Sequence, residues 1–97
     1  MIASNNQCPK FRLGQLVATP GALEALQAAG QSPAEFLARH QIGDWGDVDA
    51  EDKKANDDAL VQGERLLSAY RTCKGEKLWV ITEADRSSTC VLRPSEY

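Results

Sequence analysis

The chain has 97 residues, of which 42% are hydrophobic, and a formal net charge of −3. This length allows one domain with one small core, and the apolar content is typical of a folded rather than a disordered protein. The acidic balance does not favour a protein that binds nucleic acid through phosphate contacts. No apolar run is long enough to cross a membrane, and residues 1–10 lack the apolar centre of a signal peptide. We therefore expect a cytoplasmic protein with a flexible tail over residues 1–10 and a single domain over residues 11–97.

The candidate metal and disulfide ligands are few and scattered. The cysteines are Cys8, Cys73 and Cys90, and His40 is the single histidine. An odd number of cysteines without a CxxC pair argues against a disulfide framework and against a zinc site. We expect neither a cofactor nor a metal.

The first predicted element is a strand within residues 11–19, FRLGQLVAT. Phe11, Leu13 and Val17 alternate with residues of the other face, which is the period of a β-strand. Gly14 weakens this prediction because glycine destabilises strand interiors.

Two short helices should follow, each begun by a hydroxyl side chain and a proline. Thr19-Pro20 and Ser32-Pro33 place an N-cap before a proline at the first helical position. Glu35 is the candidate capping-box partner of the second helix. We predict helices over residues 21–29 and 33–41, the first ended by a glycine and the second burying one side. That buried side consists of Phe36, Leu37 and His40.

A third helix is predicted over residues 50–62, with Asp49 as N-cap and Gly63 as its end. Its apolar side is thin and consists of Ala55, Ala59 and Leu60. The remaining positions are mostly charged and should face water.

From residue 65 onward the pattern changes to period two, which predicts a three-stranded β-meander over residues 65–73, 76–84 and 89–93. A two-residue turn at Lys74-Gly75 would pair Tyr70 with Trp79 and Ser68 with Ile81. The second turn would pair Ile81 with Leu92 and Glu83 with Cys90. The predicted core face is Leu66, Tyr70, Trp79, Ile81, Cys90 and Leu92. This register separates Cys73 from Cys90, so we expect no disulfide between them.

Together these elements predict an α+β fold. A small antiparallel sheet, made of the C-terminal meander and the N-terminal strand, should carry about three short helices on one face.

An acidic stretch with one tryptophan is the first candidate site. The stretch does not fit a calcium-binding EF-hand loop, because Asp52 and Asp58 occupy the positions where glycine and glutamate are needed. It is either a solvated helix start or a negative surface that binds a basic partner. Trp45 is either a lid on the core or an exposed anchor for a partner. The candidate partner-binding residues are Asp44, Trp45, Asp47, Asp49, Glu51 and Asp52.

A secondary candidate surface consists of Glu83, Asp85 and Arg86 at the end of the last hairpin. Glu83 with His40 could form an acid–base pair, which would suit a small enzyme. No nucleophile motif and no phosphate-binding glycine loop accompanies them. A polar turn is the simpler interpretation, and we do not expect an enzyme.

The blocks GDWGDVDAEDKKANDDAL, GERLLSAY and KLWVITEADRSSTCVLRPSEY resemble a family of short bacterial proteins that are common on plasmids and other mobile elements. The resemblance covers residues 11–97, and the run WVITEADR is its most distinctive part. It implies no activity. A mobile-element setting favours an accessory role, such as modulating a host or defence system.

The leading functional hypothesis is therefore a non-enzymatic, protein-binding accessory protein. One alternative is a small enzyme that uses Glu83, Asp85 and His40. The other is association with nucleic acid through positive side chains. These are Lys10, Arg12, Arg39, Arg71, Arg86 and Arg93.

Overall fold

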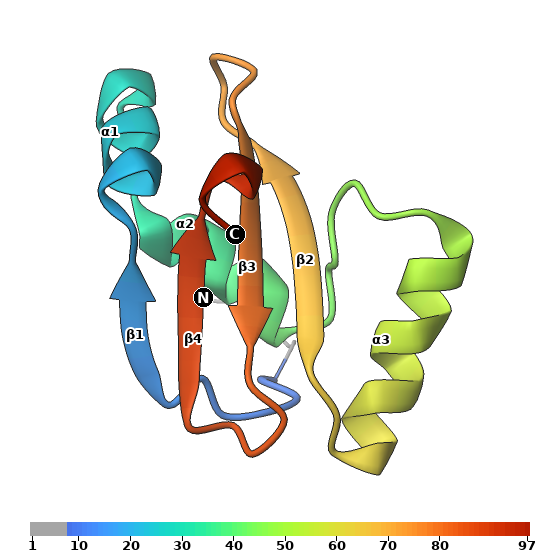
Figure 1. The fold of residues 1–97 in the computed structure, drawn as a ribbon. Coiled ribbons are helices and arrows are strands. Elements are labelled where there is room, and N and C mark those ends of the chain that lie inside the picture. Colours follow the sequence, from blue (N-terminus) through green and yellow to red (C-terminus); the bar gives the residue numbers. More distant parts are fainter. Residues whose placement is uncertain (1–7) are drawn as a thin grey trace, which may run out of the picture.

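The computed structural model describes residues 8–97, which form a four-stranded sheet, three α-helices and a short 3-10 helix (Figure 1). The α+β class predicted from the sequence is confirmed. The elements are β1 (Gln15–Ala18), α1 (Pro20–Ala29), α2 (Pro33–Gln41), α3 (Ala50–Gln62), β2 (Leu66–Arg71), β3 (Lys77–Thr82), β4 (Ser88–Leu92) and η1 (Pro94–Glu96).

The strands lie in the order β1-β4-β3-β2. Strands β2, β3 and β4 form the predicted antiparallel meander, whereas β1 pairs with β4 in parallel. The sheet is therefore mixed and not fully antiparallel, because α1 and α2 carry the chain away from β1 before the meander begins. The first and last strands of the chain lie side by side, and β1 and β2 are the two edges of the sheet.

The predicted register of the meander is wrong by one residue in the first hairpin. Tyr70 lies opposite Leu78 and not Trp79, because the turn spans Thr72–Glu76, where Thr72 N–H donates to Glu76 O at 2.9 Å. In the second hairpin Ile81 lies opposite Cys90, a shift of two residues from the prediction. A shift of one residue exchanges the two faces of a strand, whereas a shift of two preserves them.

The predicted core face is consequently right for β2 and reversed for β3 and β4. Leu66 and Tyr70 point into the core as expected, at 0% and 1% exposure. The core residues from the other two strands are Leu78, Val80, Thr82, Thr89 and Val91. The outer face carries Trp79, Ile81, Cys90 and Leu92 instead. Cys73 and Cys90 are free, as predicted.

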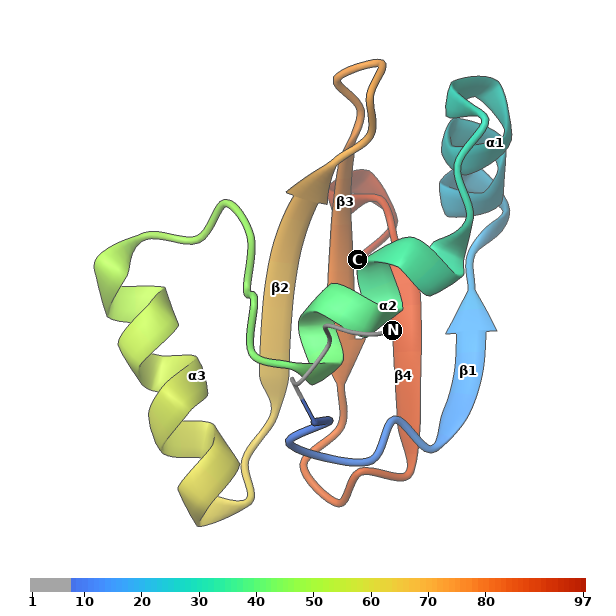
Figure 2. The ribbon, with the colours of Figure 1, turned by 180° about the vertical axis from the view of Figure 1, so that it is seen from behind.

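Helices α1 and α2 pack on the inner face of the sheet, and α2 crosses in front of β3 and β4 in the view of Figure 2. The predicted N-caps are confirmed, since Thr19 and Ser32 side chains accept from the N–H groups of Ala22 and Ala34. The predicted capping box does not form, because the Glu35 carboxylate accepts from the Gln31 side chain at 2.8 Å. The main core combines Ala22, Ala25, Leu26, Phe36 and Leu37 from the helices with Tyr70, Leu78, Val80 and Val91 from the sheet.

Helix α3 does not lie on this face but beside β2, at the edge of the sheet (Figures 1 and 2). Its buried residues are Asn56 and Ala59, whereas Ala55 is exposed, contrary to the predicted apolar side. Ala59 packs in a second cluster with Trp45 and Leu66.

The end of the described chain is tied back to the start of α1. The Glu96 carboxylate accepts from the Thr19 hydroxyl at 2.6 Å and from Gly21 N–H at 3.1 Å. These hydrogen bonds lower the pKa of Glu96. At the other end, Lys10 N–H donates to Gln41 O at 2.8 Å, so the chain is attached to α2 from Lys10. Residues 1–7 of the predicted tail lie outside the described part.

Candidate functional site

The edge of the sheet at β2 is closed by two different devices. The Asn56 side chain donates to Leu67 O at 2.8 Å and accepts from Leu67 N–H at 3.1 Å. Two residues further along β2, Ala69 N–H donates to Trp45 O at 3.0 Å, and Ala69 O accepts from Asp47 N–H at 2.6 Å. The outward groups of Leu67 and Ala69 are therefore satisfied, and no further strand can pair there.

The hydrogen bonds of Ala69 with Trp45 and Asp47 depend on the glycine between these two residues, Gly46. Its φ is +77°, and a Cβ at this position would lie 2.0 Å from Ala69 O. Only glycine combines this backbone conformation with so close an approach to a neighbouring strand. The Gly46 in GDWG is thus fixed by the need to close the β2 edge.

The opposite edge, at β1, is open. Gln15 N–H donates to Ser87 O at 2.9 Å and Thr19 N–H to Val91 O at 3.0 Å, so alternate residues of β1 face β4. The N–H and C=O groups of Leu16 and Ala18 therefore point away from the sheet. Within residues 8–97 these four groups have no backbone partner.

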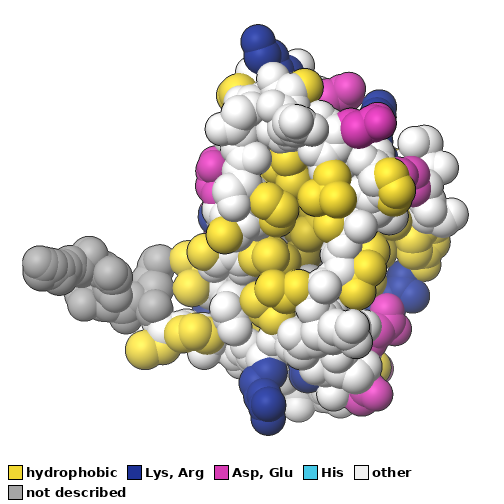
Figure 3. All heavy atoms as spheres, turned by 90° about the vertical axis from the view of Figure 1, so that its left-hand side faces the viewer, with side chains coloured by type: hydrophobic (Ala, Val, Ile, Leu, Met, Phe, Trp, Pro, Cys, Tyr) yellow, Lys and Arg dark blue, Asp and Glu magenta, His cyan; other side chains and the backbone are white. Residues whose placement is uncertain are grey.

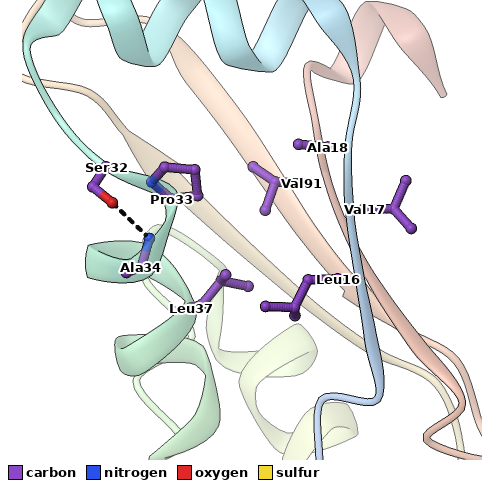
Figure 4. A pocket seen from close by; sticks show the side chains of 8 residues that line it. All are labelled: Leu16, Val17, Ala18, Ser32, Pro33, Ala34, Leu37 and Val91. Atoms are coloured by element: carbon purple, nitrogen blue, oxygen red, sulfur yellow. Dashed lines mark hydrogen bonds between the residues drawn. The ribbon is translucent and has the colours of Figure 1, made fainter.

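An apolar groove of about 320 Å³ lies beside this open edge. It is lined by Leu16, Val17, Ala18, Ser32, Pro33, Ala34, Leu37 and Val91 (Figure 4). Leu16 and Leu37 point toward one another across the groove, whereas Val17 points to the other side of the strand. Leu16, Val17 and Leu23 are 55%, 46% and 48% exposed. Hydrophobic side chains accordingly gather on this side of the molecule, with charges around its margin (Figure 3).

Sequence reasoning missed this surface, although a signal was present. No charged residue occurs between Arg12 and Glu24. Edge strands in soluble proteins usually carry a lysine or another charge that prevents pairing. An uncharged first strand next to an uncharged helix start was therefore the available indication.

The tryptophan of the acidic stretch is not an exposed anchor. Trp45 is 3% exposed, packs against Phe11 and His40, and donates its indole N–H to the Asp57 carboxylate at 3.0 Å. This hydrogen bond lowers the pKa of Asp57. Of the two interpretations of Trp45, the lid on the core is the one realised.

The acidic side chains around Trp45 serve mainly local structure. Asp44 accepts from Arg39 at 2.8 Å, which lowers the pKa of the Asp44 carboxyl. Asp47 lies 3.5 Å from the Arg71 guanidinium, and Asp49 caps α3 by accepting from Asp52 N–H at 2.8 Å. Glu51 and Asp52 point into solvent. The stretch is therefore a helix start with partnered acids, and its free carboxylates are confined to the first turn of α3.

A second hollow of about 320 Å³ lies between this loop and the outer face of the sheet. Trp79 lines it together with side chains of both charge signs, which are Asp47, Asp49, Asp52, Arg71 and Lys77. No single charge sign dominates, so the lining does not select an acidic or a basic ligand.

The secondary candidate surface is a structural turn. Arg86, at φ +60°, donates to Glu64 O at 2.6 Å and to Ala59 O at 3.2 Å, which joins this turn to the end of α3. The Asp85 carboxylate accepts from Ser87 N–H at 3.0 Å, and hydrogen bonding from the Ser87 side chain, and then from this N–H, lowers the pKa of Asp85. Glu83 is exposed. Arg86 is thus committed to backbone carbonyls rather than available to a ligand.

His40 belongs to a buried chain of hydroxyl groups. Its Nδ1 lies 2.5 Å from Ser68 Oγ, and its Nε2 lies 2.9 Å from Thr82 Oγ1. The Thr82 and Thr89 hydroxyl groups are hydrogen-bonded to each other at 2.7 Å. The Thr89 hydroxyl donates to Leu13 O at 2.7 Å. A carbonyl can only accept, so each hydroxyl must donate toward Leu13, which makes Nε2 the protonated nitrogen of a neutral imidazole.

This arrangement removes His40 from the proposed acid–base pair. Burial, and then the charge of Arg86, lowers the pKa of His40 to about 4. Both ring nitrogens are occupied by Ser68 and Thr82, and His40 and Ser68 are each 0% exposed. The acid–base pair considered for His40 and Glu83 is not formed, and the Ser68–His40 contact is buried.

Several of the cations of the nucleic-acid alternative are paired within the protein. Arg39 bonds Asp44, Arg71 lies 3.5 Å from Asp47, and Arg93 lies 3.5 Å from Glu76. Arg86 is held by carbonyl groups as described. These side chains would have to exchange carboxylate partners for phosphate.

Among residues 8–97, no group of three or more histidine, cysteine or acidic side chains could hold a metal ion. The described helices are all too short or too polar to cross a membrane. Comparisons of the chain with protein-family models, with curated proteins and with solved structures found no match.

Proposed function

We propose that this protein is a protein-binding module that accepts an extended segment along the open edge of β1. The observation that carries the proposal is the unpaired backbone of Leu16 and Ala18 beside an apolar groove. A free edge and an adjacent apolar surface are the two components of recognition by strand addition.

The two components have separate roles. Backbone groups at the edge supply hydrogen bonds that are independent of the partner's side chains, and the groove selects the side chains of alternate residues. The groove is bounded by Leu16 on one side and by Pro33 and Leu37 on the other. We expect it to prefer a segment with aliphatic side chains at every second position.

The resemblance to proteins of plasmids and other mobile elements supports an accessory role for this binding. We propose that the partner belongs to the host or to a defence system that the element encounters. Comparing how long the element persists in cells with the wild-type protein and with a β1 variant would test this part. Equal persistence would argue against it.

Peptide selection followed by nuclear magnetic resonance tests the binding proposal. A displayed library of random peptides should yield segments with alternating aliphatic residues. Adding such a peptide should shift the amide signals of Leu16 and Ala18 and the methyl signals of Leu37. Leu67 and Ala69 at the closed edge provide the internal control, because their signals should stay unchanged. If no selected peptide binds, or if the shifts map to another surface, the proposal is wrong.

A further inference from the structure

We propose that the segment bound along β1 is the β1 strand of a second copy of this chain, in an antiparallel pair whose two-fold axis passes Val17. This inference rests on the proposed function, because it concerns the same open edge: the self-pair forms when the host or defence partner is absent, and that partner would displace the second copy. It would extend the sheet from four strands to eight across the axis.

The backbone of β1 is self-complementary in this arrangement. Its outward groups belong to Leu16 and Ala18, which are two residues apart. In an antiparallel pair centred on Val17, Leu16 of one copy faces Ala18 of the other, and each such pair exchanges two hydrogen bonds. The two pairs related by the axis would satisfy all the outward N–H and C=O groups of both strands.

The side chains also fit this register. Val17, 46% exposed on the outer face, would face its own copy in the non-hydrogen-bonded position, where opposed side chains approach most closely. Leu16, which is 55% exposed on the groove side, would face the small Ala18 of the other copy. Leu16 of one copy then packs against Ala18 of the other copy, next to Leu37 of its own chain (Figure 4).

Charge favours the same partner. A two-fold axis brings each charged group near its own copy, which is unfavourable wherever a charge lies close to the axis. No charged residue occurs from Leu13 to Leu23, so self-pairing at Val17 opposes no like charges on this stretch. The groove lining contains no charged residue either, so a dimer at this edge opposes no like charges within the strand or the groove.

The pair would be reversible rather than permanent. Strand β1 has only four residues, and the apolar surface around it is limited to a few side chains. Interfaces at the small end of the observed range are commonly transient. We expect a monomer–dimer equilibrium that shifts with protein concentration.

Analytical ultracentrifugation over roughly 1 µM to 1 mM of the full chain tests the inference. The wild type should pass from monomer to dimer, and Val17→Lys should weaken the dimer at least about tenfold because it opposes two ammonium groups at the axis. Val61→Lys is the matched control, since it makes the same change at an 87% exposed position on α3. It should dimerise like the wild type.

A charge-swap mixture distinguishes pairing from a general effect of the substitution. Val17→Lys and Val17→Glu should each be mainly monomeric, and an equimolar mixture of the two should recover a heterodimer. Circular dichroism of each variant confirms that it is folded. Independently of any variant, the Leu16 and Ala18 amides of the wild type should exchange with solvent more slowly as its concentration rises.

The possible failures are separable. A wild type that is monomeric throughout, or a dimer that Val17→Lys leaves intact, overturns the second-copy inference. If the monomeric protein still binds selected peptides at β1, the proposed function survives without it. If it binds none, both are wrong.

Discussion

The two edges of the sheet are treated in opposite ways. At β2, a side-chain amide from α3 and the backbone around Gly46 occupy the outward groups of Leu67 and Ala69. At β1, the corresponding groups of Leu16 and Ala18 have no backbone partner within residues 8–97 and lie beside an apolar groove. A free edge invites pairing with another chain, and proteins commonly suppress it. The chain closes one edge with two sets of hydrogen bonds and leaves the other open, which is why we propose that a partner binds at β1.

The largest expected effect comes from breaking the closed edge at Gly46. Gly46→Ala would place a Cβ 2.0 Å from Ala69 O at a φ of +77°. We expect it to lower the free energy of unfolding by about 4 kcal/mol, because left-handed strain adds to a clash with backbone. Gly63→Ala is the control, with a φ of +73° and open space around it, and should cost about 1 kcal/mol. Chemical denaturation measures both, and equal losses would mean that the contact with Ala69 is unimportant.

The next largest loss in unfolding free energy should come from removing the Asn56 side chain, which closes the β2 edge at Leu67. Asn56→Ala leaves the N–H and C=O of Leu67 without partners, and we expect a loss of about 2–3 kcal/mol in unfolding free energy. Gln62→Ala truncates an exposed amide on the same helix and should stay within about 0.5 kcal/mol of the wild type. In hydrogen exchange, the Leu67 amide should lose its protection in the Asn56 variant alone. Retained protection would show that α3 does not close the edge.

Acid should weaken both edges together, because the hydroxyl chain of His40 runs beneath the sheet from β2 to the segment before β1. The unfolded chain takes up a proton near pH 6.5, whereas folded His40 does so only at about 4. Between these values the unfolded state binds more protons, so stability falls as pH falls. We expect a loss of about 2 kcal/mol between pH 7 and pH 5.

His40 is the single histidine, which makes this window easy to assign. His40→Gln should start from a lower stability and show a flat profile between pH 7 and pH 5, measured by urea denaturation at each pH. A slope that persists in this variant would assign the effect to other groups.

The smallest effect on stability should come from the open edge. Val17→Lys places an ammonium on a half-exposed side chain that supports little of the core, so the unfolding free energy of dilute protein should change by less than about 0.5 kcal/mol. Thermal unfolding at low concentration measures it. A loss as large as that of Asn56→Ala would mean that Val17 is structural and that the two edges differ less than proposed.

Local signals predicted most of the elements. The caps at Thr19, Ser32 and Asp49 mark helix starts because a short hydroxyl or carboxylate next to the first turn has one preferred use. The buried side of α2 followed from helical spacing alone. The meander followed from its alternation of apolar residues, but its register depended on the length of one turn, and the turn at Thr72–Glu76 is longer than the two residues assumed.

The site was less predictable, because it depends on which strand becomes an edge. Nothing local to Gln15–Ala18 indicates that this segment joins β4 in parallel, with each residue paired to one 73 positions later in the chain. Asn56 was equally hidden, since an asparagine in a charged helix is usually a solvent-exposed residue. Trp45 is the reverse of Asn56: it stands out in a polar loop and suggested a binding residue, but its ring is buried and its indole N–H donates to Asp57.

The pairing of the first strand with the last also has a consequence for how the protein is made. A ribosome adds about 5–20 residues per second, so β1 waits several seconds for β4, its partner in the sheet, to be synthesised. During that interval an uncharged apolar strand lacks its one neighbour in the sheet, and the carboxylate of Glu96 that fastens α1 is synthesised only after β4. The segment proposed to bind a partner in the finished protein is thus also unpaired and open to other chains while the chain is growing.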